Sequence, residues 1–235
     1  MDTTIDEVAP DIYRISTYVP QADLAFNQYL VYADEPLLFH CGMRALFPAV
    51  SAAVASVMPL SRLHWISFGH WEADESGAMN EWLGACPDAR VAVGTIGCML
   101  SVSDMAIRPP RALDDSETMD LGGKRVRYLA TPHVPHCWDA GLMLEESTGL
   151  LLCGDLFTRN GHCAALSSAD PVGPAIAAEE IFGATALTLQ TGPTIQRLAD
   201  LAPNSLGLMH GPVFDGNCRG ALGDLAGYYA LRADQ

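Results

Sequence analysis

The chain has 235 residues, of which 49% are hydrophobic, so it can bury a substantial core, and we expect a single domain over residues 1–235. Its formal charge of −15 argues against nucleic acid as a partner, because binding to phosphates requires a basic surface. The N-terminus lacks the basic and apolar pattern of a secretory signal, and prolines interrupt the longest apolar region, so we expect a soluble protein that does not enter the membrane.

The first part of the chain alternates short apolar runs with two helical segments. Ala45 to Met58 is predicted to be a helix, and Ser76 to Leu83 is predicted to be another, with Ser76 as its N-cap. Strands are predicted at Ile12–Ile15, Asn27–Tyr32, Pro36–Gly42 and Leu63–Phe68.

The second part of the chain contains a further group of strands, with a hairpin turn at Gly122-Gly123. Helices are predicted over Pro174 to Leu198 and over Ala221 to Leu231. The predicted strands are Arg90–Val93, Met119–Leu121, Lys124–Ala130, Leu142–Glu145, Leu150–Cys153 and Leu206–Met209. Two groups of strands with helices between and after them favour two packed sheets flanked by helices, an α/β sandwich.

Potential metal ligands follow four of these strands. His70, Glu72 and Asp74 recur at every second residue just after Leu63–Phe68, so that His70 and Glu72 can face one metal while Asp74 reaches another. Taken alone, such a segment is also compatible with an ordinary polar loop. Three further candidates each follow another apolar strand: His136, Asp155 and His210. Four strand ends that supply ligands together indicate a metal site.

The seven cysteines contain no Cys-x-x-Cys pair and would leave one residue over after full disulfide pairing. This pattern is typical of a reducing compartment, and we expect a cytoplasmic protein. Cys137 lies between candidate ligands and is a possible soft donor, although its neighbours are better ligands.

The order of these ligands resembles the metallo-β-lactamase superfamily, whose H-x-H-x-D-H loop is followed by a later His, a bridging Asp and a final His. The resemblance covers essentially the whole chain and implies a metallo-β-lactamase-like αββα four-layer sandwich. Glu72 stands where the second loop histidine is usual, and Glu75 stands where the last is usual. The form H-x-E-x-D is similar to that of flavodiiron proteins, and to that of related oxygen-binding diiron proteins without the flavodoxin domain.

The resemblance implies how the ligands divide between two iron ions. One iron would be bound by His70, Glu72 and His136, the other by Asp74 and His210, and Asp155 would bridge them. The resemblance favours His136 over His133 as the ligand, because the ligand histidine of the family commonly stands three residues before a small or acidic residue, as His136 stands before Asp139.

Three further residues remain open as additional ligands or as residues that contact the ligands. Glu75 either adds an anionic ligand or leaves the second iron with an open position. His133 becomes a pocket residue once His136 is the ligand. His40 occupies the place where the superfamily usually has an aspartate that supports the ligand loop. His40 either supports this loop in the same way or only packs in the core.

The implied function is a non-haem diiron protein that binds dioxygen or another small diatomic molecule, with no FMN site in this chain. It would serve as an oxygen sensor, or as an oxygen or nitric oxide reductase, with an external reductase or a signalling protein as partner; a homodimer is the default. Carboxylates combined with histidines suit iron or manganese better than the His-rich sets of zinc hydrolases. The alternatives are a dinuclear zinc hydrolase of the same superfamily and an interaction protein with a vestigial site.

Overall fold

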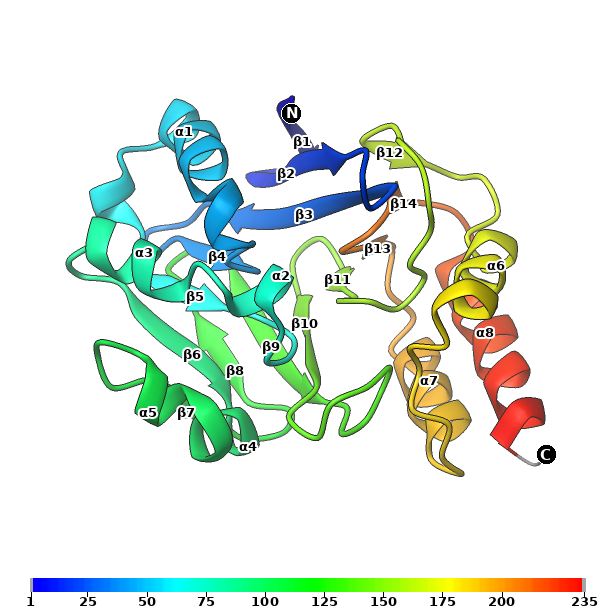
Figure 1. The fold of residues 1–235 in the computed structure, drawn as a ribbon. Coiled ribbons are helices and arrows are strands. Elements are labelled where there is room, and N and C mark those ends of the chain that lie inside the picture. The colour runs from blue at the N-terminus through cyan, green and yellow to red at the C-terminus, as the bar shows by residue number, and fades with distance from the viewer. Residues whose placement is uncertain (1, 234–235) are drawn as a thin grey trace.

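The computed structural model describes residues 2–233, in which the chain builds two seven-stranded sheets (Figure 1). The first sheet follows the order of the chain, and its pairing changes from antiparallel to parallel after the fourth strand. Its strands are β1 (Thr3–Ala9), β2 (Ile12–Val19), β3 (Leu24–Val31), β4 (Leu37–Phe39), β5 (Trp65–Ser67), β6 (Arg90–Gly94) and β7 (Arg111–Leu113).

The second sheet has the order β12-β14-β13-β11-β10-β9-β8. It is antiparallel from β8 to β11, and β11 then pairs in parallel with β13. Its strands are β8 (Thr118–Asp120), β9 (Arg125–Ala130), β10 (Gly141–Glu145), β11 (Leu150–Leu152), β12 (Leu166–Ser167), β13 (Ser205–Gly207) and β14 (Val213–Phe214).

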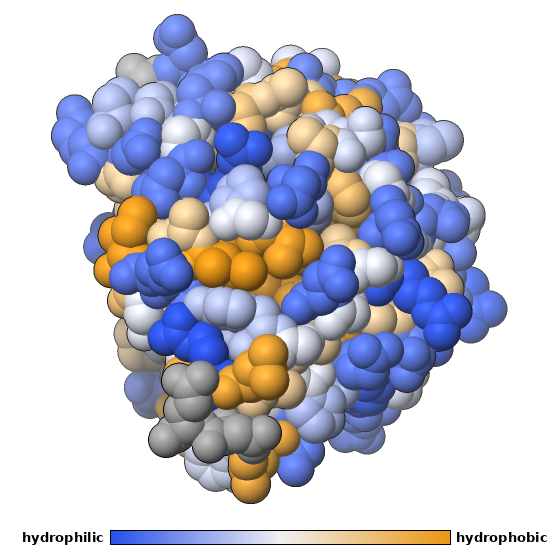
Figure 2. Space-filling model, turned by 90° about the vertical axis from the view of Figure 1, so that its right-hand side faces the viewer, coloured by the Kyte–Doolittle hydropathy of each residue, from blue (hydrophilic) through white to orange (hydrophobic). Residues whose placement is uncertain are grey.

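Helices lie on the two sides of the molecule away from the sheet interface (Figure 1). Those beside the first sheet are α1 (Phe47–Val57), α2 (Ala73–Ser76), α3 (Met79–Ala85), α4 (Thr95–Gly97) and α5 (Ser103–Met105), with short turns η1 (Arg44–Leu46), η2 (Leu60–Arg62) and the π-helical η3 (Cys98–Val102). Those beside the second sheet are α6 (Val172–Phe182), α7 (Thr191–Asp200) and α8 (Cys218–Ala233). The outer face of this second group carries apolar side chains among the polar ones (Figure 2), with Ile181 and Leu189 about 70% exposed.

Three apolar clusters hold the four layers together. Successive side chains of a strand point to opposite faces of its sheet, so neighbouring residues belong to different clusters. In β11, Leu150 and Leu152 point into the cluster between the two sheets, whereas Leu151 points toward α7 and α8. In the first sheet, Leu37 and Phe39 face the second sheet, while Leu38 packs with the cluster under α1 and α3. The predicted αββα sandwich is therefore confirmed.

One local prediction is confirmed and two need correction. The predicted hairpin at Gly122-Gly123 is present, and both glycines have positive φ angles, of 73° and 92°. Ser76 does not cap a helix: it is the last residue of α2, and its hydroxyl donates a hydrogen bond back to the carbonyl of Glu72. The long helix predicted over Pro174 to Leu198 is divided into α6 and α7, because Gly183 adopts the left-handed conformation that ends α6.

Among the described residues, no helix is both long enough and apolar enough to cross a lipid bilayer.

Candidate metal centre

The six predicted ligands come from four strand ends that meet at one edge of the two sheets. His70 and Glu72 follow β5 of the first sheet in the loop that leads into α2, and Asp74 lies in the first turn of α2. The other three follow strands of the second sheet: His136 after β9, Asp155 after β11 and His210 after β13. The backbone N–H of Gly141 in β10 donates a 2.8 Å hydrogen bond to the carbonyl of Gly69, which ties the start of the ligand loop to the second sheet.

His70, Glu72 and His136 form the first donor group. The Nε2 atoms of the two histidines face each other at 3.0 Å. Glu72 places Oε1 3.4 Å from Nε2 of His136 and Oε2 3.6 Å from Nε2 of His70. Two nitrogens that each lie about 2.1 Å from one metal, at right angles, are about 3.0 Å apart. The spacing of the two imidazoles is therefore the spacing of two ligands of one ion.

Asp74 and His210 form the second donor group. Asp74 Oδ2 lies 3.3 Å from Nε2 of His210, which is 5% exposed. The other ring nitrogen of His210, Nδ1, lies 2.8 Å from the carbonyl oxygen of Ala25 and donates to it. This hydrogen bond leaves Nε2 as the free donor atom and orients it toward Asp74, as in histidines that bind metals.

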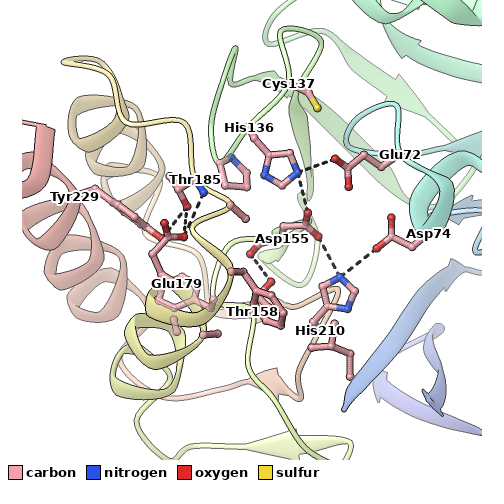
Figure 3. A pocket seen from close by; sticks show the side chains of 17 residues that line it. Glu72, Asp74, His136, Cys137, Asp155, Thr158, Glu179, Thr185, His210 and Tyr229 are labelled. Carbon is pink, nitrogen blue, oxygen red and sulfur yellow. Dashed lines mark hydrogen bonds and ion pairs between the residues drawn. The ribbon is translucent and has the colours of Figure 1, made fainter. Parts of the chain in front are cut away.

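Asp155 lies between the two groups (Figure 3). Its Oδ2 is 3.3 Å from Nε2 of His136 and 3.6 Å from Nε2 of His70, whereas its Oδ1 is 3.4 Å from Nε2 of His210. Oδ1 is buried and accepts no hydrogen bond from the described residues. A buried carboxylate oxygen whose only polar contact in the described part of the chain is this long one with His210 is costly, and a cation on each side of Asp155 would satisfy both oxygens.

Glu75 lies behind His70 rather than beside the atoms of the two donor groups. Its Oε1 is 3.3 Å from Nδ1 of His70, and its Oε2 accepts a 2.8 Å hydrogen bond from the backbone N–H of the same residue. Oε1 is also 3.3 Å from Nε2 of His40, whose Nδ1 lies 3.2 Å from the carbonyl oxygen of Asn27. Glu75 and His40 are both completely buried. The carboxylate thus contacts the ring nitrogen of His70 that is opposite to the one facing Glu72.

Two other candidates have less suitable positions. Cys137 lies near the first donor group, but burial raises the pKa of its thiol and so favours the neutral form, which is a poor ligand. His133 is exposed at the surface, and its backbone N–H closes a turn with the carbonyl of Cys137. Among the described residues, the candidate metal clusters include His136 and not His133.

The carboxylates determine the electrostatics of the centre in the absence of metal. Burial lowers the pKa of His70, but Glu75, Glu72 and Asp155 outweigh this effect and raise the pKa to about 12. Burial also lowers the pKa of His210, and Asp155 and Asp74 raise it to about 10. Protons on the imidazoles therefore occupy the positions where metal ions would balance the same carboxylates.

A cavity of about 480 Å³ opens beside the donor groups and is lined by Glu72, Asp74, His136, Asp155 and His210. Its opposite wall is formed by residues of α6 and α8, including Glu179, and by Thr185 (Figure 3). The sequence alone does not predict a functional role for these residues. The available signal was a glutamate directly after the alanine-rich helical segment Ala175–Ala178, which is too common a pattern to indicate a site.

The pKa values predict that filling the centre releases protons. At pH 7.5 the metal-free His70 and His210 both carry an extra proton, because their pKa values are about 12 and about 10, and Nε2 can bind a metal only after this proton leaves. We expect release of at least about two protons per filled chain and an affinity that falls as the pH is lowered. Calorimetric titration of the metal-free protein with Mn²⁺ in two buffers of different ionisation enthalpy measures this number.

The matched control is His133→Gln, which removes an exposed histidine and should leave the number of released protons unchanged. Equal binding heats in the two buffers would show that no proton is displaced and would contradict the expected charge state.

The chain was also compared with known proteins. A family model described as "ODP family beta lactamase" matches residues 24–171. Rubredoxin-oxygen oxidoreductase of Megalodesulfovibrio gigas is 23% identical over 137 residues, which cover 57% of this chain and 34% of that protein. Coenzyme F420H(2) oxidase of Methanothermobacter marburgensis is 26% identical over 145 residues, which cover 59% of this chain and 36% of that protein.

The solved structure of rubredoxin oxygen:oxidoreductase from Desulfovibrio gigas superposes with a TM-score of 0.81 at 19% identity, covering 99% of this chain and 62% of that one. The fold is thus the same as that of the corresponding part of a longer protein, and the matched region spans about one third of the two curated relatives. Because the family model matches well over half of its residues, the chain belongs to the ODP family of beta-lactamases.

Proposed function

We propose that this chain is a non-haem diiron protein that binds dioxygen or a similar diatomic molecule at the centre described above. The observation that supports this most strongly is the position of Asp155, whose two oxygens face different donor groups. In this proposal, His70, Glu72 and His136 bind one ion, Asp74 and His210 bind the other, and Asp155 bridges them.

The donor types favour iron. The first group consists of two histidines and one carboxylate, the combination typical of non-haem iron sites that keep open positions for oxygen. The second group combines His210 with the carboxylates of Asp74 and Asp155, which are harder donors than the histidines and thiolates typical of zinc. When bound, two ferrous ions would supply electrons to a diatomic ligand.

The residues of the chain have the remaining roles in this proposal. Glu75 orients His70 from behind and leaves the second group with three protein donors, so that a small ligand can reach it from the cavity. Leu24 and Phe157 line the cavity beside the donors and limit the access of water. His40 supports Glu75 and is held in turn by Asn27.

The names of the two curated relatives describe an oxygen oxidoreductase that uses rubredoxin and an oxidase of reduced coenzyme F420. We propose that this chain likewise meets oxygen, either as a reductase that receives electrons from a separate donor or as a sensor that passes its state to a signalling protein. All seven cysteines are free, which supports a reducing compartment such as the cytoplasm. Residues 1–235 would act as one domain, because the centre takes ligands from both sheets, and a homodimer remains the expected assembly.

The proposal predicts that protein purified without oxygen and loaded with ferrous iron contains about two irons per chain. Exposure to air should then produce a new charge-transfer band in the visible spectrum, because the bound iron is oxidised. Glu72→His should keep the fold, shift the metal preference toward zinc and abolish the band, since it replaces a hard donor by an imidazole. Metal analysis and optical spectra measure these outcomes.

Two bound zinc ions, no band on aeration and hydrolysis of esters or lactones would instead establish a zinc hydrolase. A band of full intensity in Glu72→His would show that Glu72 does not select the chemistry.

The contact between Glu75 and His70 predicts that Glu75→Gln weakens metal binding at the first group by about 10- to 100-fold, because the imidazole loses the carboxylate that orients it and raises its basicity. Competition with a metal-binding dye measures the affinity. Glu81→Gln is the matched control, since Glu81 pairs with Arg44 at the surface. Equal affinities of the two variants would exclude a role for Glu75 in positioning His70.

A further inference from the structure

The cavity beside the metal centre is larger than a diatomic molecule requires. Its volume is about 480 Å³, whereas one water molecule occupies about 30 Å³ in the liquid and dioxygen is of similar size. Cavities that hold organic ligands measure about 300–1,000 Å³. The space beside the centre therefore has the size of an organic binding site.

One face of α6 forms a wall of this cavity that is apolar except for one glutamate. Ala175, Ala178, Glu179 and Phe182 line the cavity, and their spacing of three and four residues places them on the same side of the helix. The two alanines leave the space open because their side chains are short. With Leu24, they provide a surface for a hydrocarbon body.

Glu179 is the charged group of this wall, and it is 7% exposed. Its Oε2 accepts hydrogen bonds from the backbone N–H of Thr185 at 3.3 Å and from the hydroxyl of Thr185 at 2.8 Å. The hydroxyl of Tyr229 in α8 lies 3.3 Å from the same oxygen. All three donors are neutral, and all three converge on Oε2.

The second oxygen of Glu179 has no such partner. Between residues 2 and 233, neither a lysine, an arginine nor a histidine forms an ion pair with Glu179, and no donor contacts its Oε1. Oε1 is not one of the fully buried atoms that lack a partner, so it is accessible, and Glu179 lines the cavity. A largely buried carboxylate whose partners are all neutral is stabilised when a cation approaches it. Figure 3 shows Glu179, Thr185 and Tyr229 grouped apart from Glu72 and Asp74, on the other side of the cavity.

We infer that the cavity binds an organic ammonium compound, with the cationic head on Oε1 of Glu179 and an apolar body along the Ala175 and Ala178 face of α6. An ammonium group supplies the charge and the hydrogen-bond donors that Glu179 lacks. The formal charge of −15 also favours cations in the vicinity of the protein. This site goes beyond the proposed function and does not depend on which metal ion the neighbouring centre holds.

The test compares three probes that share one hydrocarbon chain, namely hexylammonium, 1-hexanol and hexanoate, by calorimetric titration of protein whose metal content has been measured. We expect hexylammonium to bind at least about tenfold more tightly than 1-hexanol, because a charge-assisted hydrogen bond replaces a neutral one. Hexanoate should bind more weakly than both, since Glu179 repels it.

Three variants on the same helix test this assignment. Glu179→Gln should remove the advantage of hexylammonium over 1-hexanol, whereas Glu180→Gln, which changes the exposed neighbouring carboxylate, should preserve it. Ala178→Leu should weaken hexylammonium and 1-hexanol alike, because the larger side chain fills the cavity. An unchanged metal content and circular dichroism spectrum in each variant establish that it is folded.

Equal affinities of hexylammonium and 1-hexanol would overturn the inference, as would full hexylammonium binding by folded Glu179→Gln. Preferred binding of hexanoate would also overturn it, since an anion would then be the favoured ligand. If the wild-type protein binds no iron but still prefers hexylammonium to 1-hexanol, the proposed diiron function is contradicted and the ammonium site is supported.

Discussion

The structure around the centre depends on one buried carboxylate that faces two groups of ligands. Asp155 follows a fully buried strand of the second sheet, and its two oxygens point toward His136 and His210, which come from different strand ends. Four carboxylates and three histidines gather where the two sheets meet, so that negative charge accumulates in a region with little water. Protons balance this charge in the metal-free chain, and bound metal ions would balance it in their place. The ring nitrogens of His70 and His136 already have the spacing of two ligands of one ion.

The support behind the ligand loop differs from the pattern that the superfamily resemblance predicts. An aspartate is usual at position 40 and a histidine at position 75, whereas this chain has His40 and Glu75 in contact at 3.3 Å. Relative to that pattern, the acid and the base have exchanged positions. The exchange places a carboxylate behind His70, and it leaves the second donor group with Asp74, Asp155 and His210.

Much of the architecture could be predicted from the sequence, because strand alternation and strand ends are local properties. Leu150–Leu152 alternates between two apolar clusters, and Gly154 and Asp155 just beyond it mark the end of the strand. Strands β1 and β7 were missed because they contain charged or partly exposed residues rather than apolar runs. The position of Glu75 relative to His40, and the contact of Glu179 with Tyr229, which are 50 residues apart, depend on tertiary packing and leave no local signal.

The most direct test of the account is a crystal structure of the iron-loaded protein, grown without oxygen, with anomalous diffraction recorded on both sides of the iron absorption edge. The account predicts two iron peaks, one near His70, Glu72 and His136 and one near Asp74 and His210, with one oxygen of Asp155 on each. A single metal peak, or a second peak bound to Glu75 instead of Asp74, would contradict it.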